Sequence, residues 1–131
     1  MIQRVQSIYL LVAATICLAS YFIFPKLDLF FINMSLMDYF IIPYLFFCFF
    51  MSTLNIFLFI NRKLQININK FQILIHLFVF IVFFYFFYQE KMLNPDLIWT
   101  STPISSIVFL RLANKGIKKD ENLIRSVDRL R

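Results

Sequence analysis

Three long intervals without a charged residue dominate the pattern of hydrophobic and polar positions along this chain. They run from Val5 to Pro25, from Tyr39 to Asn61 and from Phe71 to Gln89. A membrane-crossing α-helix needs about 20 mostly apolar residues, because each residue rises about 1.5 Å. The pattern therefore predicts three membrane spans, over residues 5–25, 39–61 and 71–89. The first span is expected to be an uncleaved helix, because its apolar stretch is too long for a secretory signal.

A shorter uncharged interval, from Leu97 to Leu110, predicts a fourth span that needs help at both ends. Pro95 suits the first helical position, and Arg111 can extend its charge toward the membrane surface. We expect a helix over residues 95–113, kinked or loosened near Pro103. Four spans with short connections predict an all-α integral membrane protein, built as a four-span antiparallel helix bundle.

The composition and the charges agree with this class of protein and orient it. Hydrophobic residues make up 61% of the chain and charged residues only 15%, against about 25% charged in soluble domains. Positive charge gathers before the first span, in a predicted loop from Arg62 to Lys70 and from Arg111 onward. The positive-inside rule then predicts that this loop and both termini are cytoplasmic.

Tyrosine and tryptophan support the same sidedness, because these residues gather at membrane–water interfaces. All except Tyr9, which lies near the inner face, fall at the predicted outer ends of the spans: Tyr21, Tyr39, Tyr44, Tyr85, Tyr88 and Trp99.

The last residues, 114–131, form a separate charged tail after a transmembrane domain over residues 1–113. Apolar residues return in this tail at spacings of three, four and seven, which predicts a cytoplasmic amphipathic helix with one apolar stripe. Asn114 and Gly116 are expected to interrupt the preceding helix, and Asp120 is expected to cap a fresh start.

Three interpretations of the tail remain open. It can be a solvated helix that fixes topology, a helix lying on the inner leaflet, or a helix that docks a membrane or cytosolic protein. Mixed charge argues against nucleic acid, which prefers a cleaner basic face. The docking surface would comprise Ile124, Arg125, Val127, Asp128, Arg129 and Arg131.

The polar residues within the spans are the other candidates for function. An ionisable side chain such as His76 inside a span is a functional hypothesis by default. If the second and third spans are antiparallel and their connection is centred near Ile66, His76 lies at the depth of Ile56, next to Asn55. An intramembrane polar contact between Asn55 and His76 is therefore expected. The simpler interpretation is a neutral His76 hydrogen-bonded to Asn55, Ser52 or a backbone carbonyl. A haem ligand would need a second histidine from another subunit.

The hydroxylated stretch Thr100 to Ser106 could line a polar path, but it carries no charge, which favours close helix packing. Cys17 and Cys48 are expected to behave as small apolar residues, since neither has a ligand at metal-binding spacing. The sequence offers no catalytic motif, no metal site and no cofactor site.

Two segments carry a resemblance to a known family. The opening "MIQRVQSIYL" (Met1 to Leu10) and the ending "LANKGIKKDENLIRSVDRLR" (Leu112 to Arg131) resemble the ends of a bacterial family of small four-span inner-membrane proteins. That family is catalogued as domain of unknown function four-two-nine-three. The resemblance implies a multi-pass protein of the bacterial inner membrane and brings no catalytic residues with it.

Taken together, these patterns predict a non-enzymatic accessory or scaffold subunit that sits in the lipid bilayer and docks a partner through its tail. The alternative is a small transporter or channel component with a polar path along Asn55, His76 and Thr100 to Ser106. The sequence does not identify a small-molecule ligand.

Overall fold

The chain folds into four long α-helices in a computed structural model that describes residues 3–24, 30–31, 34–35, 37–89 and 94–128. The α-helices are α1 (Gln3–Ile23), α2 (Ile42–Phe57), α3 (Arg62–Tyr88) and α4 (Ser101–Asp128). A π-helical turn, η1 (Met37–Ile41), leads into α2, and 3₁₀-helices η2 (Leu58–Ile60) and η3 (Asn94–Thr100) precede α3 and α4. Two short strands, β1 (Phe30–Phe31) and β2 (Met34–Ser35), pair antiparallel between α1 and η1.

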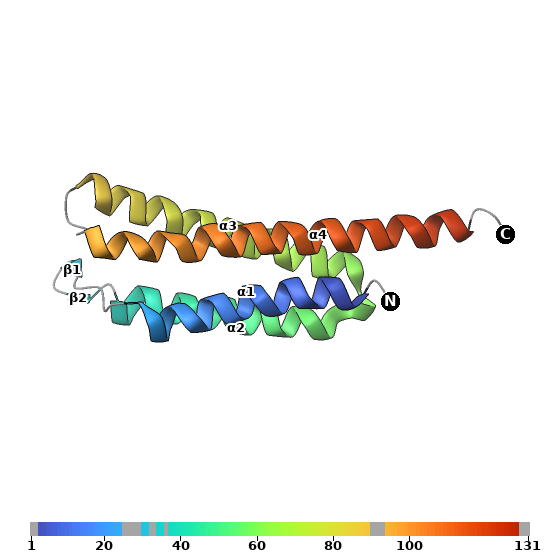
Figure 1. The fold of residues 1–131 in the computed structure, drawn as a ribbon, viewed down its shortest axis with the longest axis horizontal. Coiled ribbons are helices and arrows are strands. Elements are labelled where there is room, and N and C mark those ends of the chain that lie inside the picture. The colour runs from blue at the N-terminus through green and yellow to red at the C-terminus, as the bar shows by residue number, and fades with distance from the viewer. Residues whose placement is uncertain (1–2, 25–29, 32–33, 36, 90–93, 129–131) are drawn as a thin grey trace.

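The four α-helices pack side by side and form what we call the helical body (Figure 1). Helix α1 packs against both α2 and α4, and α3 packs against α4. The start of α1, the turn between α2 and α3 and the end of α4 lie at one end of the helical body. The end of α4 extends past the other three helices there (Figure 1).

Three helical segments are long and apolar enough to cross a membrane: Val5–Ile23, Tyr39–Ile60 and Arg62–Tyr88. They correspond to the three spans expected from the uncharged intervals, so the helical fold and these membrane-capable helices are confirmed.

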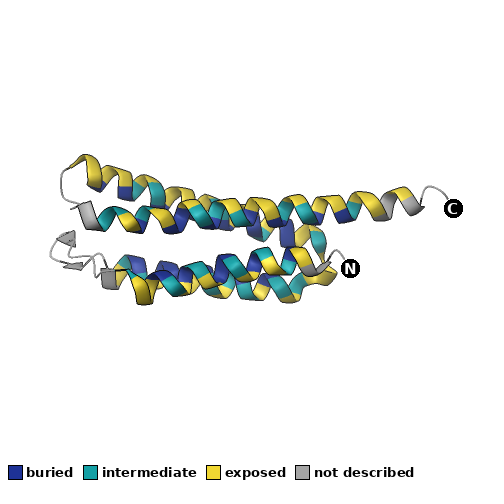
Figure 2. Cartoon of the chain, viewed as in Figure 1, coloured by how far each residue is buried: buried dark blue, intermediate teal, exposed yellow. Residues whose placement is uncertain are grey.

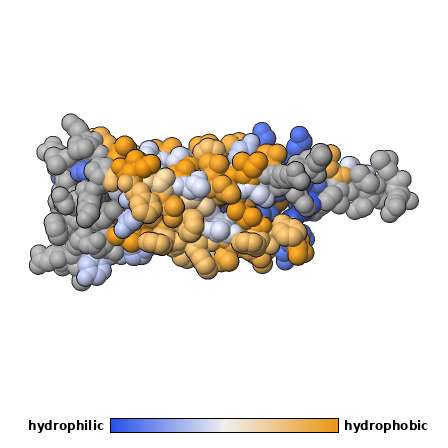
Figure 3. All heavy atoms as spheres, turned by 60° about the horizontal axis from the view of Figure 1, so that its bottom comes forward, coloured by the Kyte–Doolittle hydropathy of each residue, from blue (hydrophilic) through white to orange (hydrophobic). Residues whose placement is uncertain are grey.

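Many large apolar side chains of the helical body are exposed, and many polar side chains are buried. Figure 2 shows how buried and exposed residues alternate along the helices. Phe22, Ile60 and Tyr88 expose 73%, 84% and 81% of their surface. Apolar residues also cover the middle of the face in Figure 3, whereas hydrophilic residues gather toward the end from which α4 extends. Asn69 and His76, in contrast, are fully buried. This distribution suits a lipid environment, where polar groups must be satisfied inside the protein.

The predicted loop from Arg62 to Lys70 is wrong, because these residues form the first turns of α3. The connection from α2 is short and includes Asn61, whose backbone N–H donates to the Leu58 carbonyl oxygen. Hydropathy suggested a loop because several residues there are polar. Gln65 and Asn69 instead lie on the buried face of α3, whereas Lys63, Asn67 and Lys70 are exposed on the same helix.

The predicted interruption between Asn114 and Asp120 is also wrong, because α4 is continuous from Ser101 to Asp128. The residues that suggested a break have packing roles: Asn114 accepts a hydrogen bond from α3, and Gly116 lies against Gln6 of α1. The α-helical part begins two residues before Pro103, so the proline lies in the first turn, where its missing N–H is tolerated.

Two of the expected interface aromatics are buried instead. Tyr44 and Trp99 belong to an apolar cluster with Cys17, Cys48 and Phe83, and Trp99 meets Phe24 edge to face at 5.3 Å. The tyrosines Tyr21, Tyr39, Tyr85 and Tyr88 are exposed, as the interface pattern requires.

Candidate functional site

Helix α3 presents a line of four polar side chains to the interior, which we call the polar seam: Gln65, Asn69, Gln72 and His76. Spacings of four, three and four residues place them on one face of the helix. All four are buried. Such a line is costly in a membrane protein unless its members find partners, so those partners define the site.

At the end near the α2–α3 turn, the polar seam joins three helices through amides. The Asn55 side-chain amide donates to Asn69 Oδ1 at 2.6 Å and to the Gln65 carbonyl oxygen at 3.2 Å. The Gln65 amide donates to the Asn55 carbonyl oxygen at 3.0 Å, and Asn69 Nδ2 donates to Asn114 Oδ1 at 2.9 Å. Asn69 therefore bridges α2 and α4.

Further along α3, the polar seam contacts α2. The Gln72 amide donates to the Cys48 carbonyl oxygen at 2.9 Å and to Ser52 Oγ at 2.7 Å. His76 Nδ1 lies 2.5 Å from the Tyr44 hydroxyl. Three polar atoms of this group, Asn55 Oδ1, Gln72 Oε1 and His76 Nε2, have no hydrogen-bond partner among the residues that the structure describes.

His76 is hydrogen-bonded, as the simpler interpretation expected, but its partner is Tyr44. The reason is the position of the turn between α2 and α3. Residues that face each other on these two helices are about equally far in sequence from Asn61, and not from Ile66 as expected. His76 stands 14 residues after Arg62, the first residue of α3, or about 21 Å along the helix. The predicted contact between Asn55 and His76 is therefore replaced by two separate contacts along the polar seam.

The hydroxylated stretch Thr100 to Ser106 serves a different interface. Thr102 Oγ1 lies 2.7 Å from Ser20 Oγ, and Ser106 Oγ lies 3.9 Å from Cys17 Sγ, so both contact α1. Thr100, Ser101 and Ser105 bond to carbonyl oxygens of their own helical segment, η3 and α4. The arrangement supports helix packing and does not bring these hydroxyls to Asn55 and His76.

A polar contact between α1 and α4 was missed in the sequence. The Gln6 side-chain amide donates to Asp120 Oδ2, and both side chains are buried. A Cβ atom added at Gly116 would lie 3.0 Å from Gln6 Cγ, so the glycine permits this close approach. Asp120 acts here as a packing partner and not as the expected helix cap.

A second missed feature is the contact between the two cysteines. Cys17 on α1 and Cys48 on α2 are both buried and belong to the same apolar cluster. Their positions lie symmetrically about residues 32–33, and antiparallel neighbouring helices place such residues at equal depth. That symmetry was the signal available in the sequence.

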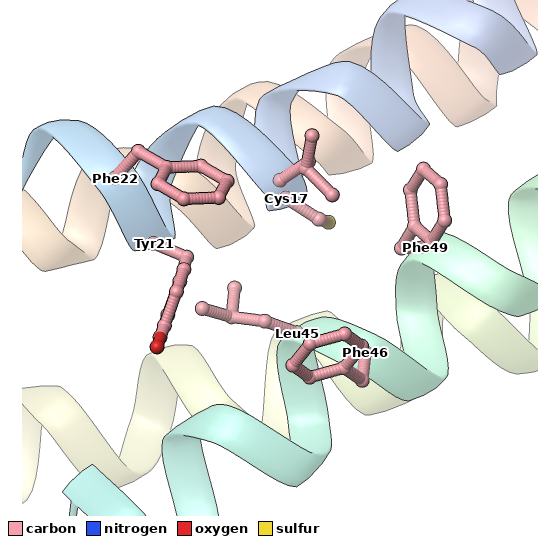
Figure 4. A pocket seen from close by; sticks show the side chains of 7 residues that line it. Cys17, Tyr21, Phe22, Leu45, Phe46 and Phe49 are labelled. Carbon is pink, nitrogen blue, oxygen red and sulfur yellow. The ribbon is translucent and has the colours of Figure 1, made fainter.

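Cys17 also lines a hollow of about 180 Å³ between α1 and α2 (Figure 4). Its other walls are apolar and aromatic, formed by Leu18, Tyr21, Phe22, Leu45, Phe46 and Phe49. Within the part of the chain that the structure describes, no group of three or more His, Cys, Asp or Glu side chains could hold a metal ion.

The tail residues expected to dock a partner are only partly described. Ile124, Arg125, Val127 and Asp128 belong to α4, but their side chains lie outside the described part of the structure. Arg129 and Arg131 lie outside the described residues altogether.

The buried polar seam, the apolar exterior and the three membrane-capable helices define an α-helical membrane protein. The family model described as "Domain of unknown function (DUF4293)" matches residues 30–130, and the chain belongs to this family. The match includes nearly all of the ending that carries the resemblance, whereas the opening from Met1 to Leu10 precedes the matched range. No curated protein and no solved structure matches the chain.

Replacing Thr102 by valine tests the packing role of the hydroxylated stretch. The substitution keeps the side-chain shape and removes the bond to Ser20, while Ser20 keeps its 2.7 Å bond to the Ile16 carbonyl oxygen. We expect the free energy of unfolding to fall by about 0.5–1 kcal/mol, measured by titrating mixed micelles with a denaturing detergent. Thr15→Val is the matched control, because Thr15 is exposed and its hydroxyl donates to the Val12 carbonyl oxygen of the same helix. Equal losses in both variants would contradict a bridging role.

Proposed function

We propose that this protein is an accessory or scaffold subunit of the bacterial inner membrane, without enzymatic activity of its own, which docks a partner protein through the end of α4. The observation that carries this proposal is the continuity of α4 from the helical body to Asp128, beyond the other helices (Figure 1). A rigid helix that leaves the membrane as an extension of a packed helix presents a defined surface to a partner.

The buried face of α4 continues into the proposed docking surface. Its buried residues include Ser106, Leu110, Ala113, Ile117 and Asp120, at spacings of three and four. Continuing the same alternation reaches Ile124 and Val127, so these residues lie on the same face by helical register. The face of α4 that packs against the neighbouring helices therefore continues beyond their ends, where another protein can bind it.

The same continuity weighs against an interfacial tail. A helix that lies in the membrane surface must turn away from the direction of the span that precedes it. Helix α4 is continuous to Asp128 and extends past the other three helices without a break. A surface-lying tail would need the interruption near Gly116 that the structure lacks.

The proposal includes four spans with both ends of the chain in the cytoplasm. Helix α4 packs along α1 and α3, so it accompanies helices that are long enough to cross the membrane. Lys63, Lys70, Lys118 and Lys119 are exposed on segments at or near the end where α4 emerges. Positive charge at that end supports a cytoplasmic position.

The alternative of a transporter or channel component gains no support from the arrangement of its residues. The hydroxyls of Thr102 and Ser106 contact α1, whereas Asn55 and His76 contact residues of α2 and α3. Beyond the His76–Tyr44 pair, the interior is filled by an apolar cluster that includes Val79, Phe83 and Trp99.

Copurification in mild detergent tests the docking surface. The double variant Ile124→Asp/Val127→Asp should lower partner recovery at least about fivefold relative to the unchanged protein, because charge opposes burial of an apolar stripe. The control Asn122→Asp/Ser126→Asp adds the same charge at two exposed positions and should recover partners normally.

A truncation complements the point variants if it keeps the packed part of α4. Ending the chain at Lys115 would remove Ile117 and Asp120, which are buried in the helical body. A chain ending at Asn122 retains both and should lose the same partners as the double variant. Equal partner recovery from the truncated chain, the double variant and the unchanged protein would refute the docking proposal.

A further inference from the structure

Three features surround Cys17 and Cys48: the packed interface between α1 and α2, a hollow beside Cys17 and polar groups near Cys48. Cys17 and Cys48 lie in one buried cluster where α1 packs against α2. A disulfide needs their sulfur atoms about 2.05 Å apart, which neighbouring thiols reach by side-chain rotation when their helices are close. The two cysteines are therefore placed where a reversible disulfide could join α1 and α2.

The hollow beside Cys17 lies next to the exposed apolar surface of α1 and α2. Its lining residues Phe22 and Phe46 are exposed on the apolar surface, at 73% and 58% of their area, whereas Leu45 is buried at its inner wall. Figure 4 shows Cys17 between these side chains, on the α1 side of the hollow. An apolar cavity of about 150 Å³ accepts a benzene-sized ring, so a hollow of about 180 Å³ has room for one six-membered ring.

A hydrogen-bonded pair, Tyr44 and His76, lies near Cys48. Tyr44 precedes Cys48 by four residues on α2 and belongs to the same buried cluster, and its hydroxyl meets His76 Nδ1 at 2.5 Å. Gln72, the next member of the polar seam, donates to the Cys48 carbonyl oxygen. Cys48 therefore lies close to polar groups of α2 and α3 as well as to apolar side chains.

We propose that Cys17 and Cys48 form a redox-active dithiol that is oxidised by a lipid-soluble quinone whose ring enters the hollow between α1 and α2. The oxidant must be apolar to enter from the membrane, flat to fit beside the aromatic walls and able to accept two electrons. Quinones are the chemical class that meets these requirements.

The reaction balances without any further reactant. The Cys17 thiol adds to the quinone ring, forming a carbon–sulfur bond and placing its proton on a quinone oxygen. Cys48 Sγ then attacks Cys17 Sγ, forming the disulfide and breaking the carbon–sulfur bond. The released electron pair stays with the ring, which takes up the proton that Cys48 loses. One dithiol and one quinone thus become one disulfide and one quinol.

This inference goes beyond the proposed docking role and does not depend on it. The disulfide would link α1 to α2 covalently. The oxidation state of the membrane quinones would then determine whether the two helices are linked.

The test uses the full chain, reduced and embedded in nanodiscs of phosphatidylethanolamine and phosphatidylglycerol without oxygen. Adding one equivalent of decylubiquinone should remove two free thiols per protein, counted by maleimide labelling and intact mass after denaturation. One quinol should appear per protein, measured by absorbance. Retention of both thiols with no quinol formed would overturn the proposal using the unchanged protein alone.

Variants separate the dithiol and the hollow. Cys48→Ser removes the sulfur that closes the disulfide and should slow quinol formation at least about tenfold. Leu18→Trp fills the hollow and should slow it by a similar factor, whereas Leu74→Trp, at an exposed position on α3, should leave the rate within about twofold. An undiminished rate in Cys48→Ser, or equal rates in the two tryptophan variants, would contradict the proposed site.

Discussion

Replacing Asn69 by leucine is expected to lower the free energy of unfolding by about 2–4 kcal/mol. Asn69 is fully buried and accepts from Asn55 while donating to Asn114, so the change breaks bonds to both α2 and α4. Hydrogen bonds between membrane helices contribute about 0.6 kcal/mol each on average and up to about 1.7. Asn114 Oδ1 also loses its donor, which adds about 1–3 kcal/mol if the oxygen stays buried.

The single tryptophan of the chain offers a direct readout of this loss. Trp99 is buried, so its fluorescence should report unfolding as mixed micelles are titrated with a denaturing detergent. Asn67→Leu is the matched control, because Asn67 is exposed on the same helix. A loss in Asn69→Leu no larger than that in the control would show that the amide bridge does not hold the three helices together.

Replacing Gly116 by leucine is expected to destabilise the contact between α1 and α4 by about 1–3 kcal/mol. Even a Cβ atom there would lie 3.0 Å from Gln6 Cγ, and the remaining leucine atoms require still more room. The same change would displace Gln6 from Asp120, whose side chain is buried. Part of the loss, about 1 kcal/mol, is offset because leucine favours a helix more than glycine does.

Two comparisons distinguish crowding from a general effect of leucine. Lys115→Leu changes an exposed neighbour on the same helix and should be nearly neutral in the same detergent titration. Shortening the opposing side chain with Gln6→Ala should recover part of the stability of Gly116→Leu, since coupled neighbours are not additive. Additive losses in the double variant would mean that Gly116 and Gln6 do not compete for the same space.

The spans illustrate what hydropathy can predict. Long apolar intervals determined three of the helices, because a helix that crosses lipid must be apolar over about 20 residues. The start of α3 was misassigned because hydropathy averages over a window and ignores direction. Residues 65, 69 and 72 are polar, yet they face inward, and their periodicity of three and four was the clue to a buried helix face.

The candidate sites were less accessible than the helices. His76 was correctly singled out as a polar residue needing a partner, but its partner depends on where the turn between α2 and α3 lies. A shift of the turn centre from Ile66 to Asn61 moves the opposing residue by about ten positions, from near Asn55 to near Tyr44. The Cys17–Cys48 contact also required the pairing of α1 with α2, which no local pattern contains.

The sequence by itself determined the class of protein, since hydrophobic length, charge distribution and helical periodicity are local properties of the chain. Tertiary structure decided which polar groups meet: Asn69 with Asn55 and Asn114, His76 with Tyr44, and Gln6 with Asp120. It also decided that α4 continues through Gly116, because a break suggested by local residues gives way to packing against α1. The physical reason is that these contacts join residues far apart in the chain, and their energies depend on helix register and depth.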